Sequence, residues 1–350
     1  MNFSASYRRN GSILIMCLWI MAILSLCAMG IGFRASLALR LSKYSLERAR
    51  AKYLAKAGIA KARVLLADDM NDSDAKDYDT LYKCGVAFSS DETPVTLFSA
   101  EKNMLGDGSF SVHYMRKREI GLGEEPAYGM MDEDRKIDIR ISKYAPNNLG
   151  EYRRIMKNLS PSMTVDRINS IMYWQGVTPD GMSVSADDAY YIKAGYLCKG
   201  KDLEYPEELK LVMGIDQALY DEIKPFVTTF TDGKVNVNTA PKEVLNALMD
   251  APPDNYRGSV ENIWHARKGS DDSEGTGDDL IFRDVGSVVE RAQEDQKTRV
   301  SEIATKYFTF SSKIFRIRSR GVSGQVARTI TCIVARPQGG KEKVFSYYEE

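Results

Sequence analysis

Residues 12–33 read SILIMCLWIMAILSLCAMGIGF, an apolar stretch of 22 residues without a charged side chain. In an α-helix, which rises about 1.5 Å per residue, this stretch is long enough to cross the roughly 30 Å hydrocarbon layer of a bilayer. It is longer than the apolar region of a cleaved secretory signal, about 7–15 residues, and no small-residue cleavage site of the A-x-A kind follows it. The stretch therefore predicts a retained transmembrane helix.

The residues that follow predict that this helix continues beyond the membrane. Residues 34–66 contain no proline and a single glycine, Gly58, and they are rich in Ala, Leu, Lys and Arg. One helix of about 55 residues would be about 80 Å long and would project from the bilayer as a stalk. Between residues 34 and 63 it carries nine Lys or Arg and one acid, Glu47. This basic surface is either solvated or faces acidic neighbours or anionic headgroups.

The composition of the whole chain is that of a globular protein. Its 350 residues suffice for one large or two modest domains, and its 48 basic residues balance 48 acidic ones, so no overall field attracts nucleic acid. Cys17 and Cys27 lie in the apolar stretch. Cys84, Cys198 and Cys332 are far apart and have no metal-site spacing, so they can form one disulfide whose pairing the sequence leaves open. Two histidines are too few for a typical zinc site.

Two stretches of the body share one pattern. Residues 132–141 (DEDRKIDIRI) and 232–240 (DGKVNVNTA) each combine an acidic turn, a lysine and a short alternating strand. Two helical stretches follow each of them, at residues 149–159 and 165–174 and at residues 242–249 and 260–267. This indicates an internal duplication at an offset of about 90–100 residues. Residues 205–220 predict two helices joined at Gly214, like a helix-hairpin-helix, but their mixed or acidic flanks argue against phosphate contact.

Alternating sequences predict the strands of an antiparallel sheet. These strands are residues 108–115, 311–321, 325–334 and 343–348. The second and third form a hairpin whose turn is predicted at residues 321–324, and its inward face comprises Phe315, Ile317, Ile330 and Val334. Residues 68–79 (DDMNDSDAKDYD) are predicted to form a solvated acidic loop.

Carboxylates supply the only candidate ligand site. Residues 270–279 (SDDSEGTGDD) form a second acidic loop, and calcium prefers carboxylate oxygens. The calcium candidates are Asp271, Asp272, Glu274, Asp278 and Asp279 of this loop, together with Asp187 and Asp188. A solvated loop without metal is the alternative. No catalytic residue is predicted, because the chain lacks GxSxG, P-loop, HExxH and Rossmann glycine motifs, and we expect a protein that is not an enzyme.

The leader Tyr7-Arg8-Arg9-Asn10-Gly11, directly before the apolar helix, resembles the class III signal of type IV pilin-like proteins. The resemblance implies that a prepilin peptidase cuts between Gly11 and Ser12 on the cytoplasmic side, that the new terminus is methylated, and that the helix stays as anchor and assembly element. Most such subunits carry a glutamate at the fifth mature position, where this chain has Met16. Its loss is typical of the K-type minor pseudopilin.

Most of the chain resembles this K-type family of type II secretion, the general secretion protein K family. The matching stretches are residues 11–33, 51–66, 206–226, 233–248 and 311–334. The resemblance implies an α+β fold with a long N-terminal transmembrane and stalk helix, a pilin-like antiparallel sheet, and an inserted, mostly helical domain containing helix-hairpin-helix-like repeats. The implied parts are a leader (1–11), a transmembrane helix (12–33), a periplasmic helix (34–67), the first part of the pilin-like core (68–141), the inserted domain (142–310) and the C-terminal strands (311–350). Asp138 and Arg140 stand where the family usually has asparagines.

The implied function is that of a minor pseudopilin at the tip of the secretion pseudopilus, acting in its assembly and in protein export across the outer membrane. The implied partners are other minor pseudopilins, met through helices and heads, the prepilin peptidase, inner-membrane lipid, and an exported protein or the outer-membrane secretin, but not nucleic acid. The chain would cross the bacterial inner membrane once, with a cytoplasmic N-terminus and a periplasmic body. The alternatives are a membrane-anchored helix-hairpin-helix DNA-binding protein of the competence type and a membrane-anchored enzyme, for which no motif speaks.

Overall fold

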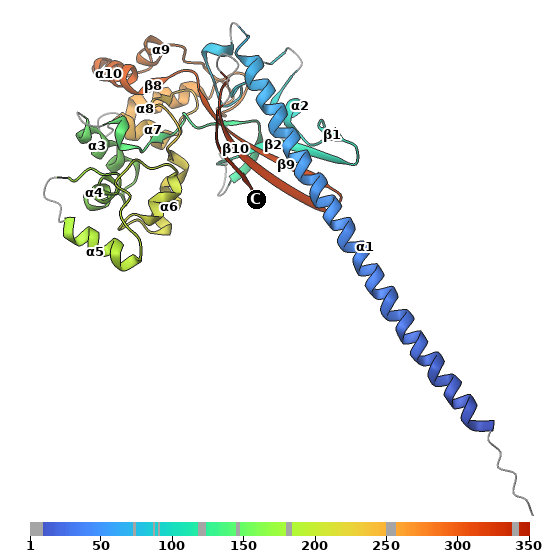
Figure 1. Cartoon of the computed structure of the whole chain (residues 1–350). Coiled ribbons are helices and arrows are strands. Elements are labelled where there is room, and N and C mark those ends of the chain that lie inside the picture. Colours follow the sequence, from blue (N-terminus) through green and yellow to red (C-terminus); the bar gives the residue numbers. More distant parts are fainter. Residues whose placement is uncertain are drawn as a thin grey trace, which may run out of the picture.

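The computed structural model describes residues 10–72, 75–86, 88–89, 92–117, 124–144, 148–179, 184–249, 257–337 and 343–350. Its first element is the helix α1 (Asn10–Asp69), which is continuous over 60 residues, as predicted. Figure 1 shows its first half running free of the rest of the protein and its second half lying on the sheet. By length and composition, one helix of the described residues, Ile13–Asp69, is apolar enough to cross a membrane.

The outer half of α1 is amphipathic and packs on the sheet. Its buried side chains recur every three or four residues, which places them on one face of the helix. They are Ala51, Leu54, Ala55, Ile59, Ala62 and Leu66. This face shares an apolar core with strands of the sheet, in which Cys84 and Cys332 are also buried. The structure contains no disulfide among the described residues.

The sheet under α1 is antiparallel. Among the described residues its main path runs through β1 (Met104–Leu105), β2 (Gly108–Lys117), β9 (Ile314–Ser323), β10 (Val326–Ala335) and β11 (Val344–Glu349), while β3 (Glu124–Tyr128) pairs with β2 and β4 (Met131–Asp132) with β9. The predicted inward face is confirmed, because Phe315, Ile317, Ile330 and Val334 are fully buried under α1.

Close approach of α1 to the sheet depends on two glycines. A Cβ at Gly321 would collide with backbone atoms of Ala51 and Ala55, and a Cβ at Gly58 would collide with the Ser319 side chain. The prediction of a turn beginning at Gly321 is therefore wrong: this glycine lies inside β9 and serves the helix contact. Gly324, with φ +56, supplies the hairpin turn instead.

A mostly helical part lies between β5 (Ile137–Asp138) and β9 along the chain and has its own buried core. Its helices are α3 (Leu149–Leu159), α4 (Val165–Trp174), α5 (Val184–Ala194), α6 (Gln217–Ile223), α7 (Lys242–Leu248), α8 (Arg257–Arg267), α9 (Val285–Val289) and α10 (Lys297–Tyr307). α3 and α4 confirm the helices predicted at residues 149–159 and 165–174. The predicted α+β class is confirmed as well, whereas the boundaries at residues 142 and 310 stay a prediction.

The helical part contains the same arrangement twice. β5 (Ile137–Asp138) pairs in parallel with β6 (Val227–Thr228), and β7 (Val235–Asn236) pairs in parallel with β8 (Phe308–Thr309). Each of these short ladders therefore joins the beginning of a helical unit to its end. This arrangement accounts for the repeated sequence pattern, although each predicted strand is only two residues long in the structure.

The first testable consequence concerns Gly321. We expect Gly321→Ala to lower the free energy of unfolding by about 1–3 kcal/mol, because the added methyl group must push α1 away from β9. The measurement is thermal unfolding of the detergent-solubilised full chain, followed by circular dichroism. Gly150→Ala is the matched control, since a Cβ there meets nothing within 4 Å and alanine favours the α3 helix. An unchanged melting temperature in Gly321→Ala would contradict the packing described.

Candidate functional site

The uncovered half of α1 is the largest candidate interaction surface. All side chains from residue 13 to residue 46 are exposed, and the exposed fractions of Met16, Trp19 and Phe33 are 66%, 67% and 70%. A continuous apolar surface of this length requires lipid or other apolar helices around it. The predicted processing site, Gly11 and Ser12, falls in the first turn of α1. The leader residues 1–9 lie outside the described residues, so cleavage stays a prediction.

The basic side chains of α1 fall into two groups. Toward the head they bind the protein itself: Lys52 pairs with Glu349 at 2.6 Å, and Lys61 donates to the Leu97 carbonyl at 2.7 Å. Just after the apolar stretch, Arg34 and Arg40 have no ion pair among the described residues. Their position beside the apolar stretch would suit anionic headgroups or acidic partners.

A buried ionic cluster ties the end of α1 to the sheet. Arg336, which follows β10, approaches Asp69 at 2.9 Å and Asp79 at 2.6 Å. Asp79 also accepts the backbone N–H groups of Gly85 (2.8 Å) and Ser312 (2.6 Å). Burial raises the pKa of the Asp79 carboxyl to about 7, against the opposing effect of Arg336. The predicted solvated loop at residues 68–79 is wrong at both ends, because Asp69 and Asp79 are buried.

The motif GKVNVNTAP, residues 233–241, works as a joint between the sheet and the helical part. The Asn236 side chain donates to the Asp79 carbonyl at 3.0 Å and to Ser312 Oγ at 2.8 Å. Asn238 exchanges two hydrogen bonds with the backbone of Phe282, at 2.9 and 2.8 Å. Thr239 donates its hydroxyl to the buried carboxylate of Asp132 at 2.7 Å. These residues serve structure, since each side chain satisfies a buried backbone or carboxylate group.

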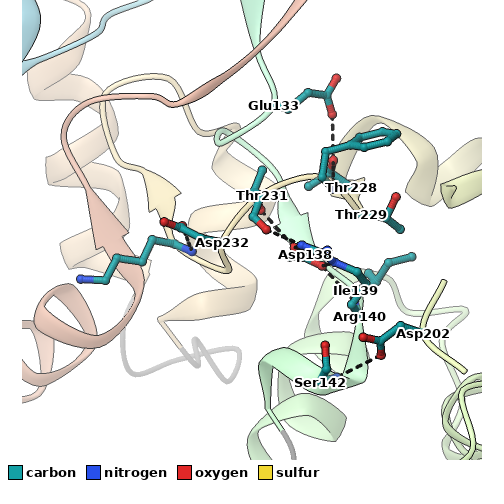
Figure 2. A network of polar contacts seen from close by, with 12 residues as sticks. Glu133, Asp138, Ile139, Arg140, Ser142, Asp202, Thr228, Thr229, Thr231 and Asp232 are labelled. Atoms are coloured by element: carbon teal, nitrogen blue, oxygen red, sulfur yellow. Dashed lines mark hydrogen bonds and ion pairs between the residues drawn. The ribbon is translucent and has the colours of Figure 1, made fainter. Parts of the chain in front are cut away.

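Glu133 is a second buried anchor at this joint. Its carboxylate contacts Lys136 at 3.2 Å and Arg316, and Thr228 donates to it at 2.9 Å, a contact visible in Figure 2. Burial alone would raise the pKa of this fully buried carboxyl, but the charges of Lys136 and Arg316 prevail and hold it at about 2. No local pattern marks this residue as important, because its partner Arg316 lies 183 positions away.

The first repeat uses an ion pair where the second uses asparagines. Arg140 binds Asp138 through Nε at 3.0 Å and through Nη2 at 2.5 Å, and Thr231 donates to the same carboxylate at 3.3 Å (Figure 2). Nearby, the Ser142 N–H donates to Asp202 at 3.1 Å. The departure at positions 138 and 140 therefore preserves a fixed turn, since a bidentate guanidinium pair replaces the amide contacts.

The helix-hairpin-helix-like element is engaged in packing. Its first helix is a 3₁₀ helix (Pro206–Leu211) instead of the predicted α-helix, its turn glycine Gly214 has φ +81, and α6 follows. The N–H of Met213 donates to Tyr191 Oη at 3.2 Å, and the N–H of Ile215 donates to the Val212 carbonyl at 3.1 Å. These two turn amides are thus used inside the protein.

The acidic loop after α8 closes on itself. Asp278 accepts from Ser270 N–H at 2.8 Å and Oγ at 2.6 Å, and Asp279 accepts from Gly275 N–H at 2.8 Å. The hydrogen bonds from Ser270 hold the pKa of the Asp278 carboxyl well below its usual range. The remaining candidates of this loop are used as well: Asp271 accepts from Ser273 N–H, Asp272 pairs with Lys268, and Glu274 pairs with Arg267.

The other two calcium candidates lie on α5, which Figure 1 shows well apart from α8. Asp188 accepts the Tyr173 hydroxyl at 2.7 Å, whereas the side chain of Asp187 lies outside the described residues. Across the part of the chain that the structure describes, no group of three or more His, Cys, Asp or Glu side chains is arranged to hold a metal ion. Calcium binding therefore stays a prediction.

Comparison with known proteins adds two findings, while no family model matches the chain. The chain is 25% identical over 268 residues to the type II secretion system protein K of Pseudomonas aeruginosa, which covers 74% of this chain and 72% of that protein. In fold it matches a chain of the crystal structure of the GspK-GspI-GspJ complex from the type 2 secretion system of enterotoxigenic Escherichia coli. The TM-score is 0.61 at 15% identity, over 88% of this chain and 99% of the other.

The second testable consequence concerns Glu133. We expect Glu133→Gln to lower the free energy of unfolding at pH 7 by about 3–5 kcal/mol, because Lys136 and Arg316 lose their buried counter-charge. The measurement is urea unfolding of the full chain in detergent. Glu101→Gln, an exposed acid, is the control and should stay within about 0.5 kcal/mol of the wild type.

The pH dependence of the same variant gives an independent check. The folded pKa of Glu133, about 2, lies below its ordinary value of 4.5, so its stabilisation is complete above pH 4.5 and is lost as the pH falls toward 2. We expect Glu133→Gln to lose less stability than the wild type between pH 5 and pH 3. Parallel acid profiles would show that the carboxylate is not paired as described.

The calcium prediction is tested by thermal unfolding with added metal. If the acidic loop binds calcium, millimolar calcium raises the melting temperature of the full chain, because a ligand that binds only the folded state stabilises it. The gain should disappear in Asp271→Asn with Asp279→Asn and should persist in Asp188→Asn if α5 takes no part. An unchanged melting temperature of the wild type would remove the assignment.

Proposed function

We propose that this chain, a K-type minor pseudopilin of type II secretion by its likeness to protein K, acts at the tip of the pseudopilus, where it starts assembly and serves protein export. The single observation that carries the proposal is α1, one helix with a wholly exposed apolar half and an outer half that packs one face against a compact head. Such a helix can pack among others in the membrane while the head stands outside it.

Met16 supports a terminal place in the filament. In pilin-like subunits a carboxylate at this position pairs with the terminal amine of a neighbour, because a charge in lipid needs a partner. A thioether makes no such pair, and residues 12–33 contain no acidic side chain that could replace the carboxylate. A subunit that begins the filament does not need this contact with a preceding subunit.

We further propose that the partners are other minor pseudopilins, bound through the helices and the heads. The support is that GspK, GspI and GspJ occur together in the crystal structure to which the fold is similar. The prepilin peptidase, inner-membrane lipid, and an exported protein or the secretin belong to the same proposal. The orientation with a cytoplasmic N-terminus and a periplasmic head is also part of this proposal. A structural role without catalysis agrees with the absence of enzyme motifs in the sequence.

A further testable consequence is processing at Gly11. We expect the membrane-extracted chain to begin at Ser12, with a methylated amine, when a prepilin peptidase is present, and at Met1 when it is absent. Glycine offers the peptidase an unhindered backbone, so a bulky substitution such as Gly11→Val should block cleavage. Intact-mass analysis reads the result directly. Gly30→Ala, elsewhere in the same helix, is the matched control and should be cut normally. An intact Met1 terminus with and without peptidase would contradict the proposed function.

A further inference from the structure

Strand β11 ends the main path of the sheet and leaves one edge open. It pairs with β10 on one side, and among the described residues no segment pairs with its other side. Three of its side chains are substantially exposed: Val344 (47%), Tyr347 (49%) and Tyr348 (41%). The opposite end of the path is β1, which has only two residues and offers little room for pairing.

The backbone groups at this edge point outward in a defined register. The N–H of Glu350 donates to the Thr329 carbonyl of the neighbouring chain segment at 2.9 Å. Because inward and outward groups alternate along an antiparallel strand, the N–H and C=O groups of Tyr347 and Glu349 point away from β10. They are positioned to hydrogen-bond an added strand.

The middle of this edge lacks the features by which soluble proteins protect open strands, whereas charged residues stand at its two ends, Lys343 before the strand and Glu349 as its last residue. Such edges usually carry an inward charge, a lysine or a proline that prevents pairing with another chain. Between Lys343 and Glu349 the sequence reads Val-Phe-Ser-Tyr-Tyr, without a charge or a proline. An unprotected apolar edge of this kind favours strand addition.

A pocket lies at the beginning of β11. The register between β10 and β11 shifts at Ile333 and Val334, and Phe345 packs on Phe230 with ring centroids 5.9 Å apart. Phe230 in turn contacts Tyr205 at 6.1 Å. These three rings help to line a pocket of about 460 Å³.

Two lysines lie on the polar rim of this pocket. Lys201 and Lys343 have no ion pair among the described residues, and the ammonium group of Lys343 lies over the Phe345 ring, 4.5 Å from its centroid. Of the two acids on the rim, Asp202 accepts the Ser142 N–H at 3.1 Å and Glu204 pairs with Lys199 at 3.5 Å. The pocket therefore suits an apolar side chain followed by a carboxylate.

We propose that β11 takes up an extended segment of another minor pseudopilin as an added antiparallel strand. Antiparallel addition brings the C-terminal end of that segment to the start of β11. There an apolar side chain enters the pocket of Tyr205, Phe230 and Phe345, and an acidic side chain or chain terminus meets Lys201 and Lys343. This inference rests on the proposed function, because helices packed side by side in the membrane would hold the neighbouring heads against this edge.

The test uses full-length chains in detergent. The tagged chain is co-expressed with the I-type and J-type minor pseudopilins of the same organism, and hydrogen exchange is measured alone and in the complex. We expect the C-terminal peptide containing Tyr347 and Glu349 to gain protection in the complex, since their outward amides become hydrogen-bonded. The β9 amides, already paired on both sides, should change little.

A proline variant distinguishes binding at the β11 edge from the stability of the fold. Tyr347→Pro removes one outward N–H but none of the hydrogen bonds to β10, so the melting temperature should stay near that of the wild type. Co-purification of the I-type and J-type proteins should weaken by about tenfold, the equivalent of one lost hydrogen bond. Tyr347→Ala keeps the N–H and should weaken co-purification much less. The charge reversal Lys201→Glu with Lys343→Glu should weaken co-purification independently of the backbone.

The outcomes distinguish this inference from the proposed function. If the siblings bind wild type and Tyr347→Pro equally and the β11 amides exchange at the unbound rate, the docking edge is wrong while the pseudopilin function stands. If no sibling binds the wild type, both are overturned. A Tyr347→Pro variant that loses binding only because it unfolds would show a lowered melting temperature, and the charge-reversed variant then decides.

Discussion

The packing of the outer half of α1 on the sheet is the constraint on which the remaining structure depends. The two halves of this uninterrupted helix differ in the exposure of their apolar side chains. The first half exposes them on every side, whereas the second half buries them along a single face. Gly58 and Gly321 allow the helix to pack closely on β9, and the apolar half continues from this contact as part of the same helix. The apolar half is thus joined to the head by one continuous helix.

The second organising feature is the buried ionic joint between the sheet and the helical part. Arg336, Glu133 and Asp132 lie where water is excluded, and charges there are tolerated only when paired or hydrogen-bonded. Their partners come from distant segments, among them the motif at residues 233–241. Nonspecific apolar contact would allow the two parts to rotate against each other, whereas these directional contacts permit one arrangement.

Much of this architecture was accessible from the sequence because it depends on local pattern. The uncharged run, the alternating hairpin and the helices α3 and α4 follow from periodicity within short windows. The residues for which the prediction from the sequence is wrong depend on partners that are distant in the chain. Asp69 and Asp79 stand in a stretch that resembles any solvated acidic loop, and their partner Arg336 lies 257 positions beyond Asp79. The sequence wrongly predicts a turn at Gly321, because a glycine that allows a helix to pack closely cannot be told, from its neighbours in the sequence, from a glycine that adopts a positive φ.

The pairing of β2 with β9 also bears on the order in which the protein folds. Gly108 of β2 pairs with Ser323 of β9, although the helical part lies between these two strands along the chain. Contacts of such long sequence separation form slowly, because a large loop must be closed first. Each helical unit, by contrast, is closed by its own short parallel ladder. As the chain folds, the helical part can therefore be complete before α1 meets β9 and β10, and the apolar face of the outer half of α1 is covered last.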